Sequence, residues 1–225
     1  MEIVYTKMQG AGNDFIVIDN RLYNFSSKQL AKLAAQVCQR KFSIGGDALM
    51  AIDHPEGTGD FRMRFYNADG TEAEMCGNGA RCIARYAYEN KVASEAMVIE
   101  TVAGPVPAWR LDRQQYKVTL NPPTVAKFDQ PFADREVPVV DYIELGDPGI
   151  PHAVVKYPGL QETSLDTLTD LAQRIRYWSA FPKGANVNFY DVDSAGELVV
   201  RTYERGVEGF TYACGTGSGA TAYVV

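Results

Sequence analysis

A cysteine–glycine element occurs twice in this chain, and it constrains the fold more than any other feature. Cys76-Gly77-Asn78-Gly79 returns as Cys214-Gly215-Thr216-Gly217, so the two cysteines lie 138 residues apart (214 minus 76). Each element follows a turn-forming acidic segment and precedes a helix-like stretch. A helix N-terminus carries unpaired N–H donors and a partial positive charge. Each element is therefore predicted to place a thiol at a helix start, where a thiolate is stabilised and a carboxylate can bind.

Two such elements acting together would present one thiol to each side of a single anionic substrate. The alternative is that Cys76 and Cys214 are structural, because most free cysteines lie buried in a core. The polar, glycine-rich flanks of both residues argue against that alternative, and we favour a functional role. Cys38 and Cys82 lie in apolar helical patterns and are predicted to belong to the core.

The composition is that of a globular protein of the cytoplasm. The chain has 225 residues, 46% of them hydrophobic, which is enough for one or two cores. A net charge of −6 and a pI near 5.0 argue against a nucleic-acid or anionic-membrane surface. No apolar run approaches the length of a membrane span. Four cysteines without paired local spacing favour a reducing compartment.

Periodicity along the chain predicts an α+β fold. Strands are expected at 2–8, 15–19, 60–66, 96–102, 106–111, 116–120, 142–145, 152–156, 185–192 and 197–204, and helices at 26–40, 80–87, 165–174 and from 214 onward. This order predicts two pseudo-symmetric halves, each a mainly antiparallel sheet wrapped around a central helix.

Asn121-Pro122-Pro123 is the best boundary between the halves. We therefore expect a first half at 1–120 that carries Cys76 and a second half at 121–225 that carries Cys214. Val225 falls inside an apolar run without a helix stop signal, so the second half is expected to be truncated at its C-terminus.

Sequence signatures of metals and cofactors are weak in this chain. It has no C-x₂-C pair and only two histidines, which argues against zinc. The dinucleotide fingerprint and the phosphate-loop lysine are also missing from the places where they would be expected. A lysine-bound pyridoxal cofactor leaves no local signature, so the residues alone leave it open.

Several polar residues could bind a ligand, and each has a structural alternative. Asn13, Asn67 and Asn78 lie in turns, where asparagine is common for conformational reasons. Asn186 lies in a strand-like run, where that explanation does not apply. Arg205 follows Glu204 at a strand end, either as half of a solvated ion pair or as a bidentate clamp for a carboxylate. His152 follows Pro151 at a loop-to-strand junction, where the default interpretation of a histidine is a structural one.

Seven segments, spread over the whole chain, carry a resemblance to a known family. They are 10–15, 65–70, 74–82, 151–152, 186–189, 203–206 and 213–217. In this order they resemble the diaminopimelate epimerases, which need no cofactor and serve lysine and peptidoglycan precursor biosynthesis. The resemblance implies an isomerase that interconverts LL- and meso-diaminopimelate, has no metal and forms a homodimer.

The resemblance also implies roles for individual residues. Cys76 and Cys214 would be the catalytic pair: one thiolate removes the α-proton, and the opposite thiol protonates the other face. The implied substrate-binding residues fall into three groups. The backbone of Gly77, Asn78, Gly215 and Thr216 would bind the α-carboxylate, His152 and Glu204 would contact the α-amino group, and Asn13, Asn67, Asn186 and Arg205 would bind the distal end of the amino acid.

Three positions depart from the family pattern. Ala48, Ile150 and Phe210 stand where some members carry glutamine, asparagine and glutamate. Two alternatives therefore stay open: a related cofactor-independent racemase of another amino acid, and a non-catalytic protein that binds amino acids. Retention of both cysteines argues against the second.

Overall fold

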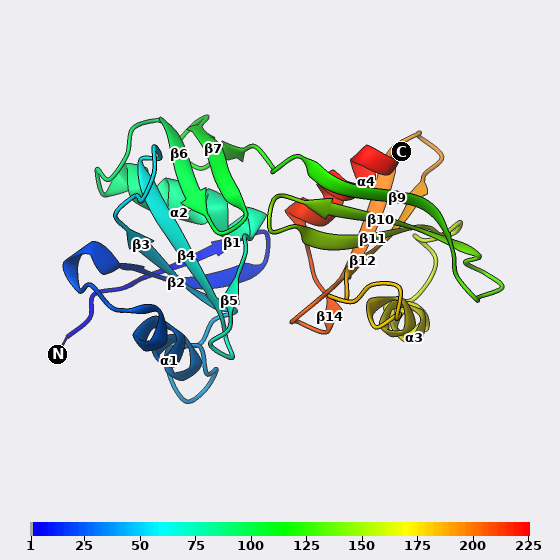
Figure 1. Cartoon of the computed structure of the whole chain (residues 1–225), viewed down its shortest axis with the longest axis horizontal. Coiled ribbons are helices and arrows are strands. Elements are labelled where there is room, and N and C mark those ends of the chain that lie inside the picture. Colours follow the sequence, from blue (N-terminus) through cyan, green and yellow to red (C-terminus); the bar gives the residue numbers. More distant parts are fainter. Residues whose placement is uncertain (1) are drawn as a thin grey trace. The chain divides into compact units, whose positions relative to one another are not determined.

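The computed structural model describes residues 2–225, which divide into two compact units, the first ending at Asn121 and the second covering Pro122–Val225. No helix in this part of the chain is long and apolar enough to cross a membrane. The α+β fold class predicted from the sequence is confirmed, since each unit combines one sheet with two α-helices (Figure 1).

The first unit is built on one twisted sheet. Its elements are β1 (Thr6–Gly10), β2 (Asn13–Asp19), the short 3₁₀ helix η1 (Asn20–Leu22), α1 (Ser27–Val37), β3 (Ala48–Asp53), β4 (Phe61–Asn67), β5 (Glu72–Ala73), α2 (Gly77–Glu89), β6 (Ala96–Thr101), β7 (Gly104–Arg110) and β8 (Tyr116–Val118). The strand order is β1-β2-β3-β4-β6-β7-β8, with β5 paired to β4. Among the strand pairs described for this sheet, β2–β3 and β4–β6 are parallel and the others are antiparallel.

The second unit has the same plan. Its elements are β9 (Pro123–Pro131), β10 (Val139–Leu145), β11 (Ile150–Lys156), α3 (Leu165–Arg176), β12 (Asn186–Val192), β13 (Leu198–Glu204), β14 (Gly209–Phe210) and α4 (Gly215–Val224). The strand order is β14-β13-β12-β11-β10-β9. The β11–β12 pair is parallel, and the other pairs of this sheet are antiparallel.

The two units share an internal repeat. The run β1-β2-α1-β3-β4-β5-α2 returns as β10-β11-α3-β12-β13-β14-α4. From β2 onward the corresponding elements begin 137 or 138 residues apart, as Asn13 and Ile150 or Gly77 and Gly215 show. The repeat therefore extends far beyond the cysteine–glycine elements that revealed it in the sequence.

In each unit the two helices cover opposite faces of the sheet. Side chains alternate along a strand, so neighbouring residues point to opposite faces. In the first unit, α1 buries Leu30 and Ala34 against Ile16, Leu49 and Tyr66. The intervening positions of the same strands face α2, because Gly79 of α2 lies against Met50 of β3 and Phe65 of β4. Coverage on both faces explains why every residue of β3 except the last is buried.

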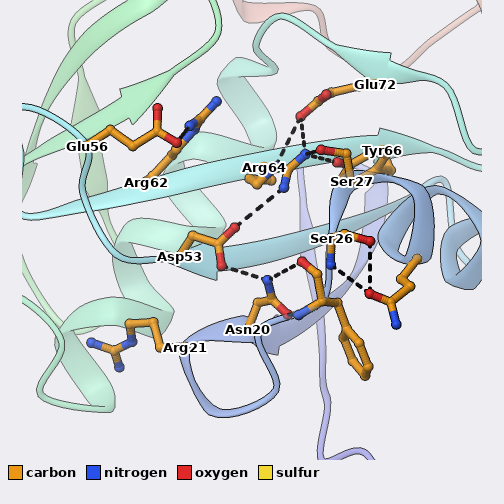
Figure 2. A network of polar contacts seen from close by, with 12 residues as sticks. Asn20, Arg21, Ser26, Ser27, Asp53, Glu56, Arg62, Arg64, Tyr66 and Glu72 are labelled. Atoms are coloured by element: carbon orange, nitrogen blue, oxygen red, sulfur yellow. Dashed lines mark hydrogen bonds and ion pairs between the residues drawn. The ribbon is translucent and has the colours of Figure 1, made fainter.

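A polar network fixes the start of α1 to the sheet (Figure 2). The amide of Asn20 donates to Asp53 Oδ1 at 2.6 Å, and its oxygen accepts from the backbone N–H of Phe25 at 2.9 Å. Arg64 of β4 donates to Ser27 Oγ at 2.6 Å and pairs with the carboxylate of Glu72 at 3.2 Å. These contacts anchor the crossover that makes β2 and β3 parallel.

Several boundaries predicted from the sequence were wrong. β1 begins at Thr6 instead of residue 2, and α1 ends at Val37 instead of residue 40. The two-residue strands β5 and β14 were missed because they are too short to show alternation. β9 was missed because its prolines suggested a boundary, although proline is tolerated on an edge strand, which β9 is.

Two glycines in the corresponding loops β4–β5 and β13–β14 provide a test of this packing. Gly70 and Gly206 have nearly the same left-handed backbone, with φ of 87° and 88°. A Cβ on Gly70 would lie 2.6 Å from the carbonyl oxygen of Ala31 in α1, whereas a Cβ on Gly206 would meet nothing within 4 Å. Gly206→Ala should cost about 1–2 kcal/mol of unfolding free energy from backbone strain alone. Gly70→Ala should cost about 1–3 kcal/mol more, because α1 must shift.

Denaturant titration of both variants measures this difference. Equal destabilisation of the two would show that α1 does not constrain the turn.

Candidate functional site

Both repeated cysteines begin a helix, as the sequence predicted. Cys76 is the N-cap of α2, and its Sγ accepts from the backbone N–H of Gly79 at 3.5 Å. Cys214 is the N-cap of α4, and its Sγ accepts from the backbone N–H of Gly217 at 3.4 Å. The hydroxyl of Thr216 also lies 3.6 Å from Cys214 Sγ. In both units the strand pair before the cysteine (β4–β5, β13–β14) delivers it to the helix start.

A glycine in each first helical turn allows the helix to lie directly on its sheet. A Cβ on Gly79 would be 2.9 Å from Met50 Sδ, and a Cβ on Gly217 would be 2.1 Å from Asn188 Oδ1. With any other residue at these positions, either the helix start or the side chain beneath it would have to shift. The backbone N–H groups of the same turns point out of the helix N-terminus, where an anion is favoured.

In the first unit, a chain of side-chain contacts connects Asn13 to α2. The amide of Asn78 donates to Asn13 Oδ1 at 2.7 Å, and the amide of Asn13 donates to Asp47 Oδ2 at 3.2 Å. Arg81 completes the chain by donating to Asn78 Oδ1. Sequence reasoning identified Asn13 and Asn78 but missed Asp47 and Arg81. The charged residue in the turn Gly45-Gly46-Asp47 was the available signal.

Asn67 lies at the end of β4 and contacts its own turn. Its amide donates to Thr71 Oγ1 at 3.0 Å, and its backbone N–H donates to the carbonyl of Thr71 at 2.8 Å. Turn chemistry, the structural alternative for this residue, therefore accounts for these contacts.

In the second unit, Asn186 joins three strand ends. Its side chain is buried, its Oδ1 accepts from the backbone N–H of Arg205 at 2.9 Å, and its amide donates to the carbonyl of Pro151 at 3.2 Å. Arg205 donates to the carbonyl of Lys183 at 3.3 Å, and Glu204 accepts from the hydroxyl of Thr211. The structure therefore brings Asn186 next to the backbone of Arg205.

His152 is fully buried in β11. Its Nδ1 lies 3.2 Å from the amide nitrogen of Asn188, and its Nε2 has no hydrogen-bond partner among residues 2–225. Burial, and to a lesser degree the positive charge of Arg205, lowers the pKa of His152 to about 3. The imidazole is therefore neutral at physiological pH. Sequence reasoning missed Asn188, although a polar residue at an inward-facing strand position was a usable signal.

The other two cysteines belong to the core, as predicted. Cys38 and Cys82 are 3% and 5% exposed, and burial raises the pKa of each thiol to about 11. Gly10 allows β1 to approach α2, because a Cβ there would lie 2.9 Å from Cys82 Sγ. Residues 2–225 hold no cluster of three or more His, Cys, Asp or Glu side chains that could bind a metal.

Comparison with known sequences gives a consistent match. The profile of the family described as "Diaminopimelate epimerase" matches residues 5–125 and 146–225. A diaminopimelate epimerase of Hydrogenobaculum sp. (strain Y04AAS1) is 40% identical, with 97% of this chain and 80% of that protein covered. The diaminopimelate epimerase of Archaeoglobus fulgidus is 38% identical, with 100% of this chain and 81% of that protein covered.

Solved structures with the same fold have more distant sequences. A probable proline racemase of Agrobacterium radiobacter K84 matches with a TM-score of 0.71 at 16% identity, covering 99% of this chain and 77% of that one. A hydroxyproline epimerase of Agrobacterium vitis matches with a TM-score of 0.67 at 17% identity, covering 98% and 75%. At this identity the likeness shows the fold alone.

Thiol labelling should separate the four cysteines. At pH 8, about one in a thousand thiols with a pKa of 11 is ionised, so iodoacetamide should modify Cys38 and Cys82 very slowly. Cys76, which is partly exposed at a helix N-terminus, should be modified first. Timed alkylation followed by peptide mass spectrometry measures the order, and the denatured protein, in which all four should react alike, is the control. Labelling of Cys38 or Cys82 as fast as Cys76 would contradict this description.

Proposed function

This chain belongs to the diaminopimelate epimerase family, and we propose that it interconverts LL- and meso-diaminopimelate by moving one α-proton between two cysteines. The family establishes the class of enzyme predicted from the sequence, an amino-acid epimerase among the isomerases. The observation that carries the proposed mechanism is the cysteine N-cap at equivalent positions of both repeats.

The chemistry requires two bases. An amino-acid α-proton is very weakly acidic, and inversion needs one group to remove it and another to protonate the opposite face. In the proposed step the C–H bond breaks as one thiolate becomes a thiol, and a new C–H bond forms as the other thiol becomes a thiolate. The reverse reaction restores the starting protonation states, so neither an oxidant nor a cofactor is consumed.

The helix N-termini supply the electrostatics for this step. Hydrogen bonds from the N–H groups of Gly79 and Gly217 favour a thiolate at Cys76 and Cys214. We assign the α-carboxylate to the backbone N–H groups of Gly77 and Asn78 and of Gly215 and Thr216. Charge that develops on this carboxylate as the proton leaves would be stabilised by the same dipoles.

The remaining residues would bind the substrate on either side of the reacting carbon. Glu204 suits the α-ammonium group because a carboxylate accepts charge-assisted hydrogen bonds. His152 would contact the same reacting centre. Arg205 would bind the distal carboxylate, and Asn13, Asn67 and Asn186 would complete the distal binding residues.

We further propose the setting of this reaction. The residues 1–120 and 121–225 form the two halves of the enzyme, which acts as a cytoplasmic homodimer without pyridoxal phosphate. Its product serves lysine and peptidoglycan precursor biosynthesis.

A racemase of another amino acid is the second candidate. It is favoured by apolar side chains where some family members carry polar ones: Ala48 and Ile150 are buried at the starts of β3 and β11. Phe210 carries less weight, because its ring packs against Tyr203 and Phe189 in the core. Rates measured with a panel of amino acids distinguish the two candidates.

The cysteine pair can be tested directly. Cys76→Ser and Cys214→Ser should each lower epimerisation about 100- to 10,000-fold, because serine is a far weaker acid than cysteine and cannot replace a thiolate base. Chiral chromatography of the two isomers and α-proton exchange in D₂O measure the effect. Cys38→Ala and Cys82→Ala are the controls and should keep activity, losing stability only through a small cavity. Near-normal turnover in either serine variant would refute the two-base mechanism.

The distal site can be tested with Arg205. A lysine cannot reproduce the bidentate fork of arginine. Arg205→Lys should therefore lower kcat/KM for diaminopimelate by an amount equivalent to about 2–5 kcal/mol of lost transition-state stabilisation. Arg201 lies on β13, the strand that leads to Arg205, but donates to the carbonyls of Gln161 and Thr163, so Arg201→Lys is a control that should leave turnover unchanged. Alanine is too short to reach Arg205 and should be a poor substrate in both variants. Efficient racemisation of alanine by the unmodified protein would favour the second candidate.

A further inference from the structure

Equivalent positions beneath the two cysteine helices carry different chemistry. In the first unit, Gly79 of α2 lies over Met50 and Phe65, and the ring of Phe65 meets Phe15 edge-on at 6.0 Å. In the second unit, Gly217 of α4 lies over Asn188 and Thr202. The repeat places Asn188, Thr202 and His152 at the positions of Met50, Phe65 and Phe15, as the strand registers show.

The three polar residues His152, Asn188 and Thr202 form a set that we call the polar trio. The fold does not require it, because the first unit builds the same helix–sheet contact from apolar side chains. His152 and Asn188 are fully buried, and Thr202 is 5% exposed. A buried polar group destabilises a protein unless it is hydrogen-bonded, so a polar set at this place needs another reason. The contacts within the trio indicate what that reason is.

The orientation of the Asn188 amide is fixed by its neighbours. Its nitrogen donates to the carbonyl of Ala153 at 3.0 Å and lies 3.4 Å from the carbonyl of Asn186. Its oxygen accepts from the hydroxyl of Thr202 at 2.9 Å. Backbone carbonyls only accept hydrogen bonds, so the end of Asn188 that faces His152 must be its NH₂ group.

This orientation determines which nitrogen of His152 carries the proton. An amide NH₂ group donates and cannot accept, so His152 Nδ1, 3.2 Å away, must be the unprotonated nitrogen. A neutral imidazole then carries its hydrogen on Nε2. That nitrogen is the one without a hydrogen-bond partner in residues 2–225, so a buried N–H donor is left to be satisfied.

We infer that Asn188 is a positioning residue that keeps His152 in its neutral Nε2–H form, so that His152 offers a bound substrate a hydrogen-bond donor. Such a donor suits an oxygen of the substrate carboxylate and cannot accept from an ammonium group. This changes the α-amino role that the sequence resemblance implied for His152 and leaves the ammonium to Glu204. Only the identity of the ligand rests on the proposed function; the tautomer does not.

Nitrogen-15 NMR of the imidazole tests the tautomer without substrate. The chain has only two histidines, so in His54→Gln protein labelled with ¹⁵N-histidine all imidazole signals come from His152. Long-range ¹H–¹⁵N spectra should show a protonated Nε2 and a bare Nδ1 in the otherwise unmodified protein. A spectrum of the Nδ1–H tautomer or of an imidazolium would overturn the inference, and this measurement depends on no variant at residue 188.

Two further variants separate positioning from packing. Asn188→Asp replaces the donor with an acceptor of the same shape and should move a proton onto Nδ1. Thr202→Val keeps the Asn188 donor and should leave the tautomer unchanged. With diaminopimelate as substrate, Asn188→Asp should lower kcat roughly tenfold or more, since a catalytic histidine in the wrong tautomer fails even when its geometry is kept.

The outcomes distinguish this inference from the proposed function. An unchanged spectrum in Asn188→Asp would overturn the positioning role. The expected spectra in a protein without epimerase activity would support the Asn188–His152 assignment and contradict the proposed function.

Discussion

This structure depends on one constraint: in each unit, the helix that follows the cysteine packs directly on the sheet at a glycine, with no side chain in between. Gly79 and Gly217 occupy the third residue of their helices and touch the strands beneath, where a Cβ would collide with Met50 or Asn188. This contact sets the depth at which each helix begins. It thereby fixes the position of the thiol at the N-cap and of the N–H groups that surround it. The short strands β5 and β14 deliver the chain to the same point, so the backbone of each site is determined before any polar side chain is considered.

The same backbone was used twice with different side chains, and the proposed reaction gives a reason. Proton transfer at one carbon needs similar thiols on both sides, and the two N-caps are nearly alike. The rest of the substrate has no such symmetry. Accordingly, Ala48 corresponds to Asn186 and Asn67 to Glu204. The layer beneath α2 is apolar, whereas the layer beneath α4 holds a buried imidazole and amide.

The sequence predicted the features that depend on local patterns. The α+β class, the helices after Cys76 and Cys214, and the core positions of Cys38 and Cys82 follow from periodicity and flanking residues. Features that depend on distant contacts could not be predicted. The pairing of β9 as an edge strand, the Asp47–Asn13–Asn78 chain and the Asn188–His152 contact each join segments that periodicity treats separately. The family resemblance named His152, but only the surroundings of Asn188 indicate which of its nitrogens is protonated.

The choice of cysteine as an N-cap has a consequence for evolution. Serine, threonine, aspartate and asparagine cap helices well, because a compact oxygen accepts strongly from the first-turn N–H groups, whereas a sulfur 3.4–3.5 Å away accepts weakly. Both helices therefore begin with a less stabilising residue than the fold would accept, in the place where the proposed reaction requires a thiol. If a descendant of this chain no longer needed the thiols, mutation toward serine or aspartate at residues 76 and 214 would be favoured by folding itself. Relatives with an oxygen side chain at both helix starts should thus be those in which selection for the reaction has ended.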